Sequence, residues 1–419
     1  MILQRFGYIL VVLCMMAPLF GPFSELFSAM MIGILVTAGI YSGQYRRRLD
    51  PVKLLGIIFI GYFAVLFLAG VMSSASLWQT LESLAPASPV LILGLAAFFS
   101  DPKWLKVDPR DIGFIATLSI LVMYFTALLL WQFQIDFKVL GKGILHHSQV
   151  NSRLRLFAGN PLPFGAIMVT LCGLSMACWG QKLLTAKIMS LSALCIGVGI
   201  VALWTEARGA FLTSGLLLIP IGIGAWRYFR ETHPSPRIYF AFAMMALIGA
   251  FYIWPAENSA LARLFVGLNT LTTGQSFDHS TFLRLVMYGA AFEAFSESWL
   301  FGYGPSERFR AIEFFIPADI TISYTHVHNV FLNHAVAAGV MGIVAVLFVL
   351  IAPLALAWKY AVDRRGSVLF LTSILTLSMF GCGMSNVLLF HDLTAYFFAT
   401  LSVIAVSTIC LTDDSLKQG

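Results

Sequence analysis

Arg208 is one of four side chains in this sequence that lie between apolar stretches and could take part in chemistry. It lies within 205–211, which reads TEARGAF, between two runs long enough to be helices. Its guanidinium carries a rigid fork of N–H donors that matches a phosphate group. Gly209 and Ala210 leave room for another group to approach closely. The alternative is an arginine that reaches from a helix end to the lipid headgroups.

His326 and His328 lie just before another apolar run, in the segment 324–332 that reads YTHVHNVFL. On a helix the two side chains would point about 200° apart and would chelate a metal ion poorly, whereas on an extended segment they could share a face. Neither an acid nor a third histidine completes a zinc pattern such as H-E-x-x-H. A histidine can take a proton from a hydroxyl group. We therefore expect no metal site and regard His328 as a candidate general base, although a histidine satisfied by neighbouring backbone is the alternative.

Arg284 lies in the segment 281–298, whose apolar residues recur at helical spacing. The helix is expected to turn Arg284, Glu293 and Glu297 away from its apolar face, and the two glutamates are candidate partners of the arginine. As an isolated residue Arg284 would be an ordinary solvated charge. The predicted apolar face comprises Phe282, Leu285, Val286, Gly289, Phe292, Ala294 and Phe295.

A membrane protein must position these side chains. The chain has 419 residues, of which 59% are hydrophobic and 11% are charged, whereas a soluble chain carries about 25% charged residues. Continuous apolar stretches recur along the chain, which favours membrane helices over a barrel. We expect an all-α polytopic fold of about twelve transmembrane helices. The predicted spans are 5–20, 23–43, 53–72, 88–100 (or from Leu77), 112–132, 161–179, 188–204, 210–226, 238–254, 331–357, 367–388 and 393–411.

The basic residues predict the orientation of the bundle. Most of the 26 lysines and arginines fall in alternate loops, and the positive-inside rule assigns that side, with both termini, to the cytoplasm. The other side carries Arg208, Arg284 and both histidines. The expected organisation is nine helices in 1–254, a large external helical loop in 255–330, and three helices with a short tail in 331–419.

Several absences narrow the chemistry. No P-loop, G-x-G-x-x-G or D-x-D motif is present, so nothing supports binding of ATP, a dinucleotide or a metal-bound nucleotide sugar. The six cysteines all fall in apolar stretches, which argues against a disulfide framework. The interiors of the predicted spans hold no lysine or arginine, and this disfavours a secondary transporter.

Together these residues resemble the O-antigen ligase and O-antigen polymerase superfamily of bacterial envelope glycosyltransferases. The turn E-A-R-G-A around Arg208 is similar to the short external Arg-Gly-Ala turn of the family. Arg284 precedes W-L-F-G-Y-G-P-S-E-R-F, which is similar to its glycine motif. His328 begins His-Asn-x-x-Leu, where a large external loop re-enters the membrane.

The resemblance implies transfer of a glycan from undecaprenyl diphosphate to an acceptor hydroxyl, at the periplasmic face of the bacterial inner membrane. It implies no cofactor, no metal and no nucleic acid. Arg208 and Arg284 would bind the diphosphate, and His328 would be the general base, with His326 as its helper. The implied reaction inverts the anomeric carbon. An O-antigen ligase acting on lipid A-core is favoured slightly over a polymerase acting on a lipid-linked glycan, and a lipid-linked glycan transporter is the alternative from another class.

Overall fold

The computed structural model describes a multi-pass helical membrane protein. It describes residues 2–20, 33, 50–73, 75–99, 107–132, 145–147, 152–154, 160–180, 184–205, 207–232, 279–320, 326–361 and 365–411. Seven helices of this part are long and apolar enough to cross a membrane, and Arg208–Gly224 and Asp392–Ser407 are shorter apolar helices. Apart from residue 33, the predicted spans 23–43 and 238–254 lie outside the described residues, so the number of twelve helices stays a prediction.

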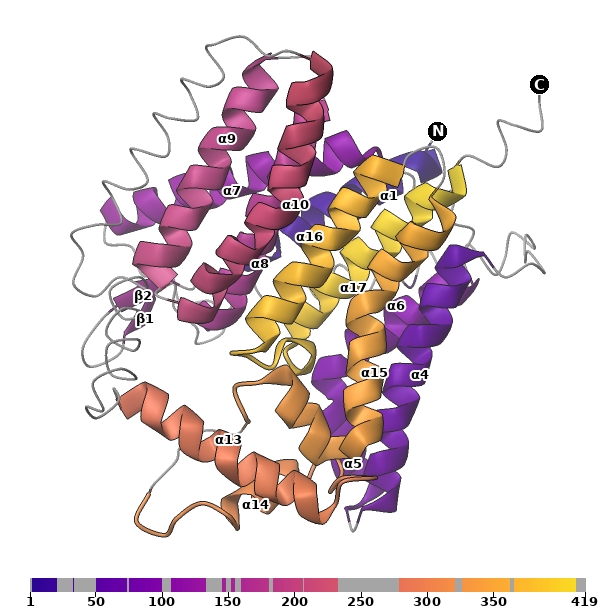
Figure 1. The fold of residues 1–419 in the computed structure, drawn as a ribbon, viewed down its shortest axis with the longest axis vertical. Helices are drawn as coiled ribbons and strands as arrows, with labels where there is room; N and C mark the ends of the chain where they lie inside the picture. The colour runs from indigo at the N-terminus through magenta and orange to yellow at the C-terminus, as the bar shows by residue number, and fades with distance from the viewer. Residues whose placement is uncertain are drawn as a thin grey trace.

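The helices form one bundle, with α13 (His279–Glu297) and α14 (Arg308–Glu313) lying across one end of it (Figure 1). α8 and α17 are enclosed by their neighbours, and nearly all of their residues are buried. Large apolar side chains of the outer helices, such as Leu68, Phe125 and Phe348, are exposed, as a lipid-facing surface requires. The bundle comprises α1 (Ile2–Met15), α2 (Ala17–Phe20), α4 (Pro51–Met72), α5 (Leu77–Leu84), α6 (Ser88–Phe99), α7 (Pro109–Gln132), α8 (Pro161–Ser175), α9 (Leu184–Gly199), α10 (Arg208–Thr232), α15 (Val330–Tyr360), α16 (Arg365–Gly383) and α17 (Asp392–Ser407).

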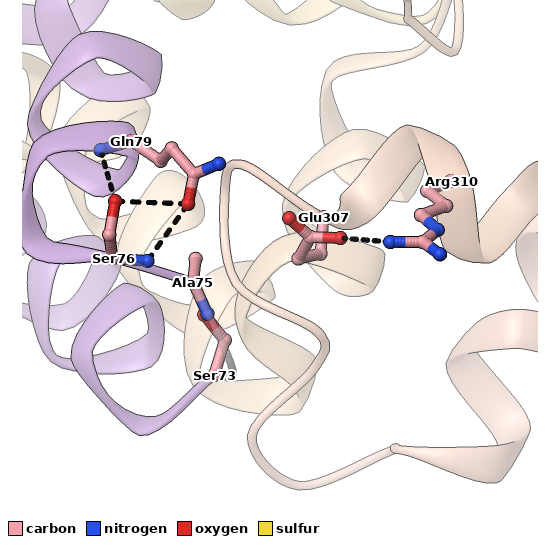
Figure 2. Close-up of polar contacts among 6 residues, drawn as sticks. All are labelled: Ser73, Ala75, Ser76, Gln79, Glu307 and Arg310. Atoms are coloured by element: carbon pink, nitrogen blue, oxygen red, sulfur yellow. Dashed lines mark hydrogen bonds and ion pairs between the residues drawn. The ribbon is translucent and has the colours of Figure 1, made fainter.

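Polar side chains begin several of these helices by accepting bonds from unpaired backbone N–H groups. Asp50 accepts from the N–H group of Lys53 at the start of α4. Ser76 and Gln79 form a reciprocal capping box at the start of α5 (Figure 2). α5 and α6, joined by a 3-10 turn at Ala85–Ala87, form one candidate span from Leu77 to Phe99. The earlier start predicted for the fourth span is therefore confirmed.

One short hairpin departs from the all-α prediction. β1 (Leu145–His147) pairs antiparallel with β2 (Ser152–Leu154), and His146 lies opposite Arg153. The hairpin lies between the predicted spans 112–132 and 161–179. Two chain segments a few residues apart can satisfy each other's backbone groups in this way without a longer sheet.

The helix predicted over 281–298 is present as α13, but most of its predicted apolar face is not the buried face. Phe282, Leu285 and Phe292 are exposed. The buried face instead contacts α14 and α15. Apolar residues lie on both the exposed and the buried side of α13, so periodicity alone could not select a side, and three alanines on the buried side allow close packing. The buried residues of α13 are Leu283, Met287, Ala290, Ala291 and Ala294.

The span predicted over 331–357 is not one continuous helix. Ala338 and Gly339 have non-helical backbone angles, and Gly339 has a φ of 62°. The break divides α15 into a short first part, which begins at Val330, and a longer second part. A break within a membrane helix releases backbone N–H and C=O groups that need other partners.

The segment 299–304 supplies those partners. The N–H group of Tyr303 donates to the carbonyl oxygen of Val336 at 2.9 Å, and the N–H group of Val340 donates to the carbonyl oxygen of Trp299 at 2.7 Å. The chain just after α13 is thus hydrogen-bonded into the break in α15. These bonds fix the first part of α15 relative to α13.

Replacing Gly302 with alanine is expected to destabilise this junction. Gly302 has a φ of 66°, and a Cβ atom added there would lie 2.5 Å from the backbone nitrogen of Ala338. Left-handed backbone strain and a clash with main chain together cost about 1–3 kcal/mol. Thermal unfolding of the purified variant should show a lower Tm. Gly289→Ala is the matched control, because a Cβ atom at Gly289 meets nothing within 4 Å, and equal Tm values for the two variants would contradict this account.

Candidate functional site

One face of α13 connects the start of α10 with the start of α15. Thr281, Arg284 and Tyr288 are spaced so that they share this face. The guanidinium of Arg208, the first residue of α10, donates to the hydroxyl of Thr281 at 3.0 Å. The hydroxyl of Tyr288 donates to the carbonyl oxygen of His328 at 2.7 Å. The predicted residues from three distant parts of the sequence therefore lie along a single helix face.

The turn after α16 closes the other side of this arrangement. The carbonyl oxygen of Met384 accepts from the Asn329 side chain at 3.3 Å and from the Tyr288 hydroxyl at 3.4 Å. The next residue, Ser385, packs against Gly209, where an added Cβ atom would lie 1.7 Å from the Ser385 hydroxyl oxygen. The close approach predicted at Gly209 is confirmed. The turn 384–385 therefore contacts both Gly209, next to Arg208, and Asn329, next to His328.

His326 and His328 lie side by side on a non-helical segment. Their ring centroids are 4.8 Å apart, and the rings meet edge to face at 72°. Val327 between them is fully buried in the small core under α13. Because neighbouring side chains of an extended segment point to opposite sides, the two histidines share the other side. Of the two arrangements that the sequence allowed, the structure has the one in which His326 and His328 share a face.

Asn329 ends this segment and begins α15. Its backbone is extended, and its side-chain oxygen accepts from the N–H groups of Phe331 at 2.9 Å and Leu332 at 3.1 Å. This cap starts the helix directly after His328. The position of His328 is therefore set by the start of α15 and by the bond from Tyr288.

The surroundings of the two histidines keep both rings neutral. Burial lowers the pKa of His328 to about 3, with further lowering from His326 and from the charge of Arg284. Burial also lowers the pKa of His326 to about 4, with further lowering from Arg308 and His391. A neutral imidazole has a nitrogen lone pair with which it can accept a proton.

These shifts predict that activity depends weakly on pH in the mildly acidic range. A histidine with an ordinary pKa would be mostly protonated at about pH 5.5, and a reaction that needs its neutral form would slow roughly tenfold from neutral pH. With the lowered pKa of His328, we expect little loss over that interval when the initial transfer rate is measured.

The stability of the fold, in contrast, should depend on pH in this range. Since the unfolded histidines bind protons near pH 6.5 and the folded ones do not, stability should fall as the pH drops below about 6.5.

Sequence reasoning missed Thr281, Tyr288 and Arg308. The first two were detectable, because they lie three residues before and four residues after Arg284. The predicted pairing of Arg284 with Glu293 or Glu297 is wrong, because both glutamates are exposed and lie nine and thirteen residues farther along the same helix, too far for an ion pair. Among the described residues, no group of three or more His, Cys, Asp and Glu side chains could hold a metal ion.

Comparison with known proteins gives one family match. No curated protein matches the chain. The segment that matches a family model runs from residue 191, in α9, to residue 347, in α15, and includes both arginines and both histidines of the site. That model is described as O-antigen ligase.

Proposed function

Because residues 191–347 match a family model described as O-antigen ligase, we propose that this chain is a membrane glycosyltransferase with a glycan donor linked to undecaprenyl diphosphate. The acceptor is a hydroxyl of lipid A-core. The observation that carries the proposal is the shared face of α13. This face carries Arg284, contacts Arg208 at Thr281 and, through Tyr288, holds the backbone of His328. Two guanidinium cations and a neutral histidine thus belong to one arrangement.

Arg208 and Arg284 bind the diphosphate in this proposal. Each guanidinium donates charge-assisted hydrogen bonds to phosphate oxygens. As the bond between the anomeric carbon and the diphosphate oxygen breaks, negative charge grows on the leaving group. Fixed cations stabilise that charge in the transition state more than in the ground state. The diphosphate therefore leaves without protonation by a general acid.

His328 acts as the general base. Its neutral ring removes the proton of the acceptor hydroxyl while that oxygen attacks the anomeric carbon opposite the departing diphosphate, so the configuration inverts. A bound diphosphate neutralises Arg284, whose charge lowers the pKa of His328 in the free protein. Donor binding therefore strengthens the base. His326, in edge contact with His328, restricts the orientation of the catalytic ring.

We place the reaction at the periplasmic face of the bacterial inner membrane, with both termini in the cytoplasm. The positive-inside rule favours this orientation, and α13 and α14 lie together at one end of the bundle (Figure 1). The apolar bundle provides a surface for the polyprenyl chain of the donor.

The test is transfer by purified protein in nanodiscs that contain undecaprenyl-diphosphate glycan, with EDTA present throughout. One arm offers rough lipopolysaccharide as the acceptor, and the other offers only a second donor molecule. Glycan attached to lipopolysaccharide supports a metal-independent ligase. Lengthened lipid-linked glycan would identify a polymerase instead. The absence of both products, with folded protein and a matched donor, would overturn the proposal in favour of transport.

A further inference from the structure

Arg308 is a further cation beside the histidine pair. It is the first residue of α14, a helix that contacts both α13 and α15. Its Nε atom donates to the side-chain oxygen of Asn333 at 3.2 Å, and its guanidinium lies 4.6 Å from the ring centroid of Phe390. It also donates to the carbonyl oxygen of Pro305. The side chain is held from several sides and is only partly exposed.

No described carboxylate neutralises Arg308. The acidic residue next to it, Glu307, turns away and pairs with Arg310 at 3.8 Å (Figure 2). Arg310 is an ordinary surface charge with 86% of its side chain exposed. Burial lowers the pKa of Arg308 to about 10, and the guanidinium stays charged at neutral pH. A partly buried cation without an anion is unfavourable unless a ligand supplies one.

Further unpaired donors surround this cation. Asn333 is fully buried and its side-chain nitrogen has no hydrogen-bond partner. The orientation of its amide is fixed, since Arg308 can only donate and the oxygen of Asn333 must face it. The hydroxyl of Ser306, in the same turn as Arg308, is also buried and unpaired. A guanidinium, an amide nitrogen and a hydroxyl together need a ligand that is rich in acceptor oxygens.

The location of this cluster separates it from the two predicted diphosphate arginines. Asn333 lies one helical turn beyond Asn329, the cap that follows His328, and its N–H group donates to the carbonyl oxygen of Asn329. Arg208 instead contacts the first turn of α13 at Thr281, whereas Arg308 follows the C-terminal end of α13. Of the two adjoining histidines, His326 lies close enough to Arg308, and His328 close enough to Arg284, to be affected by its charge, so the pair separates Arg308 from Arg284.

We propose that Arg308, Asn333 and Ser306 form a second anion subsite, which binds a phosphate group of the acceptor while Arg208 and Arg284 bind the donor diphosphate. The assignment to the acceptor rests on the proposed function. The subsite brings the acceptor to His328 from the side opposite the leaving group, as inversion requires.

The expected result for Arg308→Gln is a rise of about tenfold in the KM for rough lipopolysaccharide, equivalent to the loss of one charge-assisted contact, with the KM for the donor unchanged. Arg310→Gln removes the same charge two residues away and should change neither KM. Arg308→Lys keeps the charge without the fork and should give an intermediate value. A rise in the donor KM, or no change in the acceptor KM of a folded variant, would overturn the subsite.

Binding without turnover separates this proposal from the proposed function. Native mass spectrometry would compare rough lipopolysaccharide before and after enzymatic removal of its phosphate groups. The unmodified protein and Arg310→Gln should prefer the phosphorylated form, and Arg308→Gln should lose the preference. If the unmodified protein transfers no glycan but shows this Arg308-dependent preference, the subsite stands and the transferase proposal fails. Equal binding of both forms by the unmodified protein would reject the subsite even if transfer occurs.

Discussion

Replacing His328 with glutamine is expected to lower the rate of glycan transfer by about 10²–10⁴-fold, the usual contribution of a positioned general base. Glutamine retains hydrogen-bonding groups of similar reach but cannot accept the hydroxyl proton. The backbone of residue 328 would still accept from Tyr288, and the cap at Asn329 would remain. The KM for the donor should therefore change little while kcat falls. Single-turnover transfer in nanodiscs measures the chemical step directly.

His326→Gln is the matched control for this change, because the two rings lie side by side and the substitution is the same. We expect a smaller loss of kcat, since a helper orients the base without taking the proton. A His328→Gln protein within threefold of the unmodified rate would place the base elsewhere. A His326→Gln protein with the larger loss would exchange the two roles.

Replacing Arg284 with glutamine is the second change with a large expected effect. Loss of a fixed group that stabilises leaving-group charge costs about 10²–10³-fold in rate, and the effect should appear in kcat/KM for the donor. Arg208→Gln should behave alike. If both arginines hold the same diphosphate, the double variant should lose much less than the product of the two single losses. Arg284→Lys should recover only part of the activity, because an ammonium lacks the planar fork.

The controls use charge changes away from the predicted donor site. Arg310→Gln should retain full activity, and thermal unfolding should show that Arg284→Gln remains folded. Product lipids resolved by mass spectrometry would report donor consumption and acceptor extension separately. Donor kinetics that are unchanged in both Arg208→Gln and Arg284→Gln would reject the diphosphate site.

The types of residue in the candidate site were readable from the sequence, because an arginine or a histidine between apolar runs stands out against hydropathy. Their arrangement was not readable. The bond from Tyr288 reaches the backbone carbonyl of His328. Every residue has such a carbonyl, so the residue types do not indicate this bond. Nothing in the sequence singled out Arg308. Arg308 is distinguished by the fact that the neighbouring Glu307 pairs with Arg310 and not with Arg308. Which of the two arginines Glu307 pairs with depends on tertiary packing.

The membrane helices were predictable for a different reason, since length and apolar content suffice to identify a span. The break in α15 escaped the same reasoning. The run around Ala338 and Gly339 is as apolar as its surroundings, and the groups that satisfy the break come from 299–304. Likewise, the buried side of α13 was chosen by contacts with α14 and α15 and not by its own periodicity.

The junction between 299–304 and α15 sets the boundaries for any chimera made to change acceptor preference. A graft that replaced only the segment 255–330 would bring a foreign partner to the carbonyl of Val336 and the N–H group of Val340, which now bond to Tyr303 and Trp299. Those groups lie in a membrane helix, where water cannot replace a lost partner. The unit that can be exchanged intact therefore continues past the end of the loop and includes Val340.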